Sequence, residues 1–166
     1  MNKLVYILLT GLFLNTAASA QAIRTEKNLD AKTKTSFFNL ETGKAVKETE
    51  VWDLAFKGTT IKLNSSSKVK VTAQVLKDSS FDKVLKAPAT GFKEDTQSTS
   101  AIPTGSGNGW YTYDMSTHEI QPIKDRVIIV KTSGGKVIKL DIQSYYLDQD
   151  EFGETGFYTF RYAALK

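Results

Sequence analysis

Cysteine is absent from the 166-residue chain, and its absence removes several classes of site at once. Without a thiol the protein cannot form a disulfide, a zinc–thiolate centre, an iron–sulfur cluster or a cysteine nucleophile. The N-terminal region also lacks the cysteine to which a lipid anchor is attached, so we expect that the protein is not a lipoprotein. A chain without covalent cross-links has to draw its stability from its hydrophobic core.

Histidine and methionine are almost as scarce, with His118 as the single histidine and only Met1 and Met115 as methionines. A histidine-rich metal site is therefore excluded, and an imidazole proton relay would have to use His118. The chain has no G-x-S-x-G elbow, no P-loop and no G-x-G-x-x-G before a helix. The glycine-rich residues 105–109 lack the following Lys-Ser/Thr pair of a phosphate loop and predict a flexible turn. We therefore expect a protein that is not an enzyme.

Only one long apolar run is present, and it lies at the N-terminus. Lys3 precedes an apolar stretch from Leu4 to Leu14, and Ala18-Ser19-Ala20 forms an A-x-A cleavage site. This pattern is typical of a secretory signal peptide over residues 1–20, and the run is shorter than the ~20 residues that a membrane span requires. We expect a mature domain of residues 21–166 without a transmembrane segment, located in the periplasm, on the cell surface or outside the cell.

Charge of one sign is not concentrated anywhere in the mature chain. Without Lys3, 21 basic residues face 18 acidic ones, a net charge of +3. The lysines alternate with apolar residues, as in IKL (61–63) and KVKV (68–71), a spacing typical of the solvated face of a strand. We therefore expect no nucleic-acid partner.

Alternating apolar residues predict a mainly β protein of antiparallel strands and hairpins in a single domain. The predicted strands cover residues 35–40, 51–57, 59–64, 68–76, 110–114, 126–132, 137–146 and 157–162. RVIIVKT (126–132) is apolar enough to be buried on both faces, and SGGK (133–136) predicts a hairpin turn after it. Long helices are absent from the pattern.

The middle of the chain departs from the strand pattern. Residues 79–87 predict at most a short helix with a serine N-cap, which Pro88 would end. Residues 89–109 are dominated by Thr, Ser, Gly, Asp and Pro and predict a long loop, a feature that is often functional or mobile.

Two carboxylates of the chain could form a catalytic pair. Asp53 follows Trp52, and Asp141 lies on the apolar strand VIKLDIQ (137–143), so the two could act as general acid and base if the fold brought them together. Acidic residues on the solvent face of a strand are the ordinary explanation of the same pattern.

The segment GWYTYDMSTH (109–118) is chemically the most distinctive part of the chain. It combines the aromatic residues Trp110 and Tyr113 with Met115 and His118. An aromatic surface that offers a thioether and an imidazole suits a haem, because both groups are good ligands of haem iron. The alternative is that Trp110 and Tyr113 belong to the core, with Met115 and His118 exposed in the turn that follows.

Several segments resemble the HmuY family of haem-binding proteins in their order and spacing. They are VWDLAFK with IKLN (51–57 and 61–64), GWYTY (109–113), RVIIVKT (126–132), and SYY with GFYTFRY (144–146 and 156–162). The resemblance runs from about residue 35 to the end of the chain.

The resemblance implies an exported haem carrier, built mainly from β-strands, that scavenges haem for iron acquisition beside a TonB-dependent outer-membrane receptor. Family members hold haem between two axial side chains, a pair of histidines or a pair of methionines. Counted from the tryptophan of the W-x-x-[YF] strand, one family ligand falls on Met115, which the resemblance therefore implies as a haem-iron ligand.

The chain departs from the family pattern at the expected position of the other ligand. Residues 81–91 contain no histidine and no methionine, and the chain is shorter there than the haem-binding members. Met115 would then act alone or with a substitute such as His118, a tyrosine or a deprotonated lysine. The alternative function is a non-catalytic HmuY-like structural or interaction domain that has lost haem binding.

Overall fold

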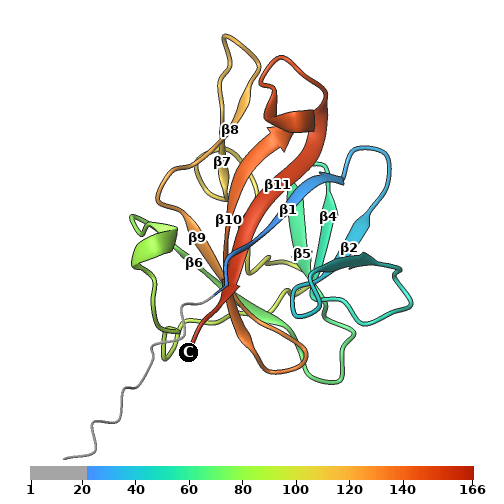
Figure 1. The fold of residues 1–166 in the computed structure, drawn as a ribbon, viewed down its shortest axis with the longest axis vertical. Helices are drawn as coiled ribbons and strands as arrows, with labels where there is room; N and C mark the ends of the chain where they lie inside the picture. Colours follow the sequence, from blue (N-terminus) through green and yellow to red (C-terminus); the bar gives the residue numbers. More distant parts are fainter. Residues whose placement is uncertain (1–21) are drawn as a thin grey trace, which may run out of the picture.

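The computed structural model describes residues 22–166, so the predicted signal peptide over residues 1–20 lies outside the described residues. Two antiparallel sheets and a separate two-stranded hairpin make up the described chain (Figure 1). Between residues 22 and 166 there is no helix long and apolar enough to cross a membrane.

The larger sheet has five strands in the order β1-β11-β10-β9-β6, and the smaller has four in the order β3-β2-β4-β5. The strands are β1 (Arg24–Asp30), β2 (Ser36–Asn39), β3 (Lys44–Val46), β4 (Leu54–Lys57), β5 (Thr60–Leu63), β6 (Thr72–Leu76), β7 (Tyr111–Tyr113), β8 (Ile120–Pro122), β9 (Val127–Lys131), β10 (Val137–Tyr146) and β11 (Thr155–Ala164). Two short 3-10 helices, η1 (Phe81–Lys83) and η2 (Leu147–Gln149), lie between them. β7 and β8 pair only with each other.

The main core lies between the two sheets and is rich in aromatic rings. Phe38 of β2 meets Phe160 of β11 edge to face with ring centres 5.2 Å apart, and Phe56 of β4 stacks on the same ring at 5.4 Å. All three phenylalanines are fully buried. Aromatic pairs of this kind stabilise beyond the area that they bury, so these rings hold the two sheets face to face.

A second, smaller cluster covers the outer face of the larger sheet. Here η1 places Phe81 against Val127 and Ile129 of β9. Lys139 of β10 is buried beneath η1, where its ammonium donates to the carbonyl oxygens of Phe81 and Val84 at 2.7 and 2.8 Å and lies 4.3 Å from the centre of the Phe81 ring. Burial lowers the pKa of Lys139, and the two carbonyls and the ring offset part of the cost of burying its charge.

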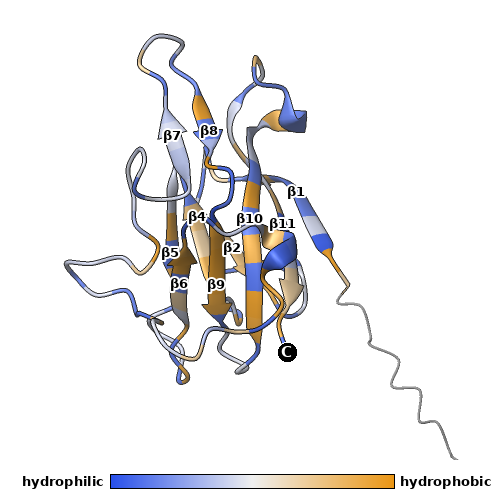
Figure 2. Ribbon diagram, turned by 90° about the vertical axis from the view of Figure 1, so that its left-hand side faces the viewer, coloured by the Kyte–Doolittle hydropathy of each residue, from blue (hydrophilic) through white to orange (hydrophobic). Residues whose placement is uncertain are grey.

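The predicted fold class is confirmed, and each predicted strand range contains or overlaps a strand of the structure. β9 is buried along Val127–Val130, the apolar run expected from the sequence and orange in Figure 2, and it ends on the exposed Lys131. The turn at residues 133–136 joins it to β10, with Val137 opposite Lys131. Residues 89–109 contain no named strand or helix, as predicted for a long loop.

The short helix predicted over residues 79–87 is reduced to the single turn η1, and Ser80 makes no capping hydrogen bond through its side chain. Lys139 binds the carbonyl of Phe81, which a longer helix would use internally, and also that of Val84, which has no helical partner because residue 88 is proline. Three strands were not predicted: β1, β3 and β8. Each is short or strongly polar and lacks the alternation by which strands are recognised.

Candidate functional site

Three of the four predicted site residues lie at the free end of the β7–β8 hairpin, which projects from one end of the sandwich (Figures 1 and 2). The last pair of the hairpin is Tyr113 opposite Ile120, and residues 114–119 form the turn between them. Tyr113 is the last residue of β7, while Met115 and His118 belong to the turn.

Asp114 gives this turn a defined shape. Its backbone N–H donates to the carbonyl of Glu119 at 2.9 Å, and its carboxylate accepts from the hydroxyl and the backbone N–H of Ser116 at 2.6 and 2.7 Å. The Ser116 hydroxyl is the largest of the influences that lower the pKa of Asp114, followed by the backbone N–H groups of Ser116 and Thr117. The carboxylate thus stays ionised as the acceptor around which the turn folds.

Met115 is exposed in this turn, with 77% of its surface accessible. A thioether placed in the core would contribute packing, whereas one held at the tip of a hairpin contributes little to the fold. Its sulfur is therefore free to meet a ligand from outside.

Tyr113 and His118 form a side-chain pair across the base of the turn. The Tyr113 hydroxyl lies 2.6 Å from His118 Nδ1, and both residues are exposed. His118 has a φ of 59°, in the left-handed region that side chains other than glycine enter at a cost. The backbone thus adopts an unfavourable conformation where the imidazole reaches the phenol.

Trp110, the fourth predicted residue, lies elsewhere. Its indole is 3% exposed, packs against the rings of Tyr111, Tyr145 and Tyr158, and donates through Nε1 to the carbonyl of Thr59 at 2.9 Å. It anchors the base of the hairpin to the core and is separated from the exposed turn. The structure therefore combines parts of both interpretations of this segment, with Trp110 in the core and Tyr113, Met115 and His118 at the surface.

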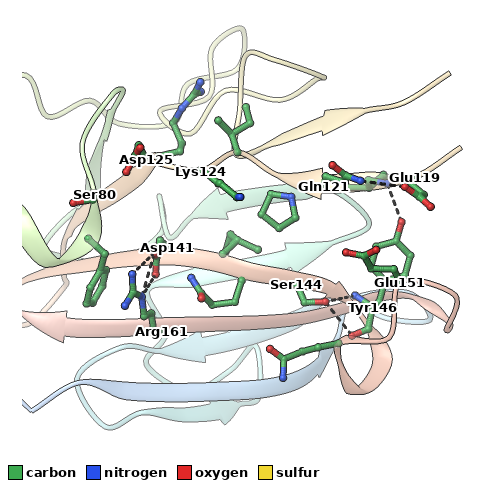
Figure 3. Close-up of a pocket in the computed structure, with 18 residues that line it drawn as sticks. Ser80, Glu119, Gln121, Lys124, Asp125, Asp141, Ser144, Tyr146, Glu151 and Arg161 are labelled. Atoms are coloured by element: carbon green, nitrogen blue, oxygen red, sulfur yellow. Dashed lines mark hydrogen bonds and ion pairs between the residues drawn. The ribbon is translucent and has the colours of Figure 1, made fainter. Parts of the chain in front are cut away.

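A groove of about 730 Å³ runs beside the hairpin and was not predicted (Figure 3). One wall is the segment 119–126, which leads from the turn of the hairpin through β8 to β9, and the other is β10 at residues 141–144. Ser80 and Phe81 border the groove, as do Gln149 and Glu151. Its volume lies within the usual range of small-molecule sites.

The floor of the groove carries a cross-strand ion pair. Arg161 of β11 stands opposite Asp141 of β10 in the register, and its Nε and Nη2 donate to the carboxylate at 2.9 and 3.1 Å. Burial raises the pKa of Asp141, and the hydrogen bonds from Arg161 oppose this shift. In the sequence, the only sign of this ion pair was a charged residue of opposite sign on each of two neighbouring predicted strands, Asp141 and Arg161.

Arg126 lies in the same wall of the groove as Lys124. Arg126 Nη1 donates to the carbonyl of Asn108 at 3.1 Å and to that of Gly109 at 2.5 Å, which ties the long loop to the start of β9. Its Nε is buried and has no hydrogen-bond partner in the described part of the chain. With Arg161, these side chains give the groove three cationic groups, of which Arg161 is already paired.

The segment expected to supply the other axial ligand reaches this groove without an iron ligand of the family's kind. Phe81 is buried in the second cluster, and residues 81–91 hold neither histidine nor methionine. The three exposed side chains predicted as site residues, Tyr113, Met115 and His118, therefore all come from the β7–β8 hairpin.

Asp53 and Asp141 have separate structural partners. Asp53 is fully buried, with its carboxylate accepting from the backbone N–H of Leu40 at 2.9 Å and from the N–H and hydroxyl of Ser133 at 3.0 and 3.1 Å. Asp141 lies on the outer face of the larger sheet, paired with Arg161, and Asp53 does not line the groove. Each carboxylate is thus engaged in holding the fold.

Comparisons with known proteins agree with the resemblance seen in the sequence. The family model described as HmuY protein matches residues 31–162. The apo HmuY analogue of Tannerella forsythia is 15% identical with a TM-score of 0.63, over 89% of this chain and 97% of that one. Apo PinO of Porphyromonas gingivitis is 14% identical with a TM-score of 0.63, over 89% and 99%.

A third structure, from Bacteroides vulgatus and described as HmuY-like and haem-binding, is 19% identical with a TM-score of 0.56, over 84% of this chain and 90% of that one. At these identities the likeness shows a shared fold. A search of curated protein sequences finds no match to the chain.

Proposed function

This chain belongs to the HmuY family, and from that premise we propose that it is an exported haem-binding protein whose iron ligand is presented by the β7–β8 hairpin. The observation that carries the proposal is the exposure of Met115, the only methionine in the described part of the chain, at the tip of that hairpin. The function is binding and scavenging of haem rather than catalysis. Delivery of the haem to a TonB-dependent outer-membrane receptor is supported by the family resemblance alone.

The residues around the hairpin fit a haem in their chemistry. Met115 offers a thioether, and His118 an imidazole, both of which ligate haem iron. Lys124 and Arg126, in the adjacent groove, are cations of the kind that pair with the two carboxylates of a haem. When bound, the haem supplies the iron that these donors coordinate, and the ordered turn around Asp114 holds the thioether exposed before the ligand arrives.

The export of the protein is part of the same proposal. The signal-peptide pattern of residues 1–20 supports an exported protein in the periplasm, at the cell surface or outside the cell. A carrier of this kind meets haem outside the cytoplasm.

The test is a spectroscopic titration of the purified protein with haem under reducing conditions. We expect a Soret shift in the wild type and at least a tenfold loss of affinity for ferrous haem in Met115→Leu, which keeps the apolar bulk and removes the sulfur. Val69→Ala, an exposed apolar position between β5 and β6, is the control for adhesion of haem to apolar surface and should titrate as the wild type does. An identical Soret shift in Met115→Leu would remove Met115 from the site.

A second candidate function is an HmuY-like structural or interaction domain that no longer binds haem. The specific observation in its favour is that residues 81–91 offer no histidine or methionine, so the described chain lacks the family's pair of ligands on opposing segments. Protein that stays colourless, with no spectral response to haemin in either oxidation state, would support this candidate and reject haem binding.

A further inference from the structure

We propose that a surface depression beside Trp52 binds an uncharged saccharide, at a site separate from the β7–β8 hairpin and its groove. The depression has a volume of about 550 Å³, within the usual range of small-molecule sites. Its walls come from the loop between β3 and β4, the loop between β5 and β6, and the turn between β9 and β10. It shares no lining residue with the groove, so the site does not depend on the haem binding proposed above.

The indole of Trp52 is held in a fixed position at the surface. Its Nε1 donates to the carbonyl of Glu48 at 3.1 Å, and its ring packs against Phe37 with ring centres 4.9 Å apart. Asn64 fixes the backbone at the same point, because its Nδ2 donates to the carbonyl of Trp52 at 2.9 Å. The ring remains half-buried and lines the depression. Trp52 thus presents an apolar surface whose orientation is set before a ligand arrives.

Polar side chains surround this ring from two loops. The lining includes the carboxylate of Glu48, the hydroxyls of Ser66 and Ser67, and the ammonium of Lys68. The backbone N–H groups of both serines donate to Asn64 Oδ1 at 3.0 and 3.1 Å, whereas their hydroxyls have no partner in the described part of the chain. Glu48 and Lys68 likewise form no ion pair among residues 22–166. Four hydrogen-bonding groups are therefore available to a ligand beside one aromatic ring.

This combination selects a saccharide. One face of a pyranose carries C–H groups that pack on an aromatic ring, and its hydroxyls both donate and accept hydrogen bonds. The carboxylate accepts from such hydroxyls, the ammonium donates to them, and the serines do both. A purely apolar ligand would cover these four groups without satisfying them, at a cost for each.

The charges of the lining favour an uncharged ligand. The carboxylate of Glu50 is engaged by the backbone N–H of Lys47 at 2.7 Å, and that of Glu48 is matched by the ammonium of Lys68. An anion such as haem would meet these carboxylates, and a cation would meet the ammonium. A neutral sugar uses both kinds of group without a net charge of its own.

The test is an NMR titration of the haem-free protein with three uncharged trisaccharides: maltotriose, cellotriose and tri-N-acetylchitotriose. The chain has two tryptophans, and Trp110 is buried in the core, so its indole N–H signal is an internal control. We expect at least one trisaccharide to shift the indole signal of Trp52 saturably and to leave that of Trp110 in place. Glucuronate, a charged sugar, should shift neither signal.

Variants of the polar groups test the site without disturbing the indole. Glu48→Ala and Ser67→Ala should each weaken binding of the same trisaccharide at least threefold, because each removes a hydrogen-bonding group. Glu154→Ala, an exposed carboxylate in the loop between β10 and β11, is the matched control and should titrate as the wild type does. Trp52→Ala should abolish binding, and if circular dichroism shows that it has failed to fold, the two polar variants still decide the question.

A weaker affinity in either polar variant, together with the shift of Trp52, supports the proposal. The absence of a saturable shift with all three trisaccharides overturns it. An equal shift of Trp110, or an affinity unchanged in both Glu48→Ala and Ser67→Ala, also overturns it, since binding would then lie elsewhere. Because no haem is present, these outcomes leave the proposed function to its own Soret titration.

Discussion

At the scale of single residues, Asp53 shows how a buried carboxylate is used by this fold. It lies directly before β4 and is fully buried. Its carboxylate oxygens accept hydrogen bonds from the backbone N–H of Leu40 and from the N–H and hydroxyl of Ser133. A buried ionised group is tolerated when such donors satisfy it. Asp53 therefore links the smaller sheet to the turn between β9 and β10, a structural role that needs no reaction to explain it.

We expect Asp53→Ala to lower the free energy of unfolding by about 2–4 kcal/mol, because three donors lose their acceptor inside the protein. The measurement is chemical denaturation followed by circular dichroism. Glu48→Ala, an exposed carboxylate in the preceding loop, is the control and should change stability by less than about 0.5 kcal/mol. A hydrolytic activity that disappeared in folded Asp53→Ala would return this residue, with Asp141, to consideration as a catalytic group.

At the scale of elements, the β7–β8 hairpin is a small unit attached to the sandwich at its base. Trp110 inserts its indole into the core just before β7, and its carbonyl accepts from Ile123 just after β8 at 2.8 Å. Nearer the turn, the backbone N–H of Ile120 donates to the hydroxyl of Tyr146 on β10 at 2.9 Å. A two-stranded ribbon is marginally stable alone, so these attachments keep its turn in a fixed position.

The bond to Tyr146 predicts a local effect of removing one hydroxyl. In Tyr146→Phe the N–H of Ile120 loses its acceptor, and we expect a loss of about 1–2 kcal/mol in global stability together with faster amide exchange at Ile120. Hydrogen exchange measured by NMR provides the readout. Tyr145→Phe, the neighbouring buried tyrosine whose hydroxyl accepts no bond from the hairpin, should leave exchange at Ile120 as it is. Equal exchange rates in Tyr146→Phe and wild type would show that the Tyr146 hydroxyl does not hold the hairpin in place.

At the scale of the whole molecule, the turn between β9 and β10 joins the two sheets at their edge. Besides Asp53, Glu41 reaches this turn from the smaller sheet, accepting from the hydroxyl of Thr132 and pairing with Lys136 at 3.3 Å. Gly134 lies so close that an added Cβ would be 2.2 Å from Glu41 Oε1, so a side chain at this position would require the Glu41 carboxylate to shift. Two carboxylates of one sheet thus bind a single turn of the other.

The link through Glu41 makes stability depend on pH. The hydrogen bond from Thr132, with further contributions from Lys136, lowers the pKa of Glu41 below its ordinary value near 4.5. A carboxyl whose pKa is lower in the folded state contributes stability above about pH 4.5, and this contribution is lost as the pH falls through the folded pKa. In Glu41→Gln the unfolding free energy should therefore be lower at pH 7 and should fall less steeply between pH 5 and pH 3.

Denaturant titrations at pH 7, 5, 4 and 3 measure this dependence. Lys136→Met removes one contribution and leaves the Thr132 hydrogen bond, so its pH dependence should fall between those of the wild type and Glu41→Gln. Parallel pH profiles for all three proteins would contradict a role for Glu41 in acid sensitivity.

Much of the fold was predictable from local pattern, and the exceptions are informative. β9 and β10 were recognised because their apolar residues are dense and close in sequence. β1 was missed because RTEKNLD lies at the edge of the larger sheet and buries only Leu29, so its strand conformation comes from pairing with β11 rather than from its own side chains. The sequence singled out Met115 and His118 together with Tyr113 because all three lie in one short segment.

The amino-acid sequence alone was enough to establish a cysteine-free, mainly β protein and to single out one segment with donors for haem iron, because composition and alternation are local properties. The pairing of Tyr113 with His118, the removal of Trp110 into the core and the groove beside the hairpin depended on the folded chain. The groove arises where segments distant in sequence meet, since Asp141 and Arg161 line it together with residues 119–126. Such contacts depend on how the two sheets pack as wholes, and no short stretch of residues determines them.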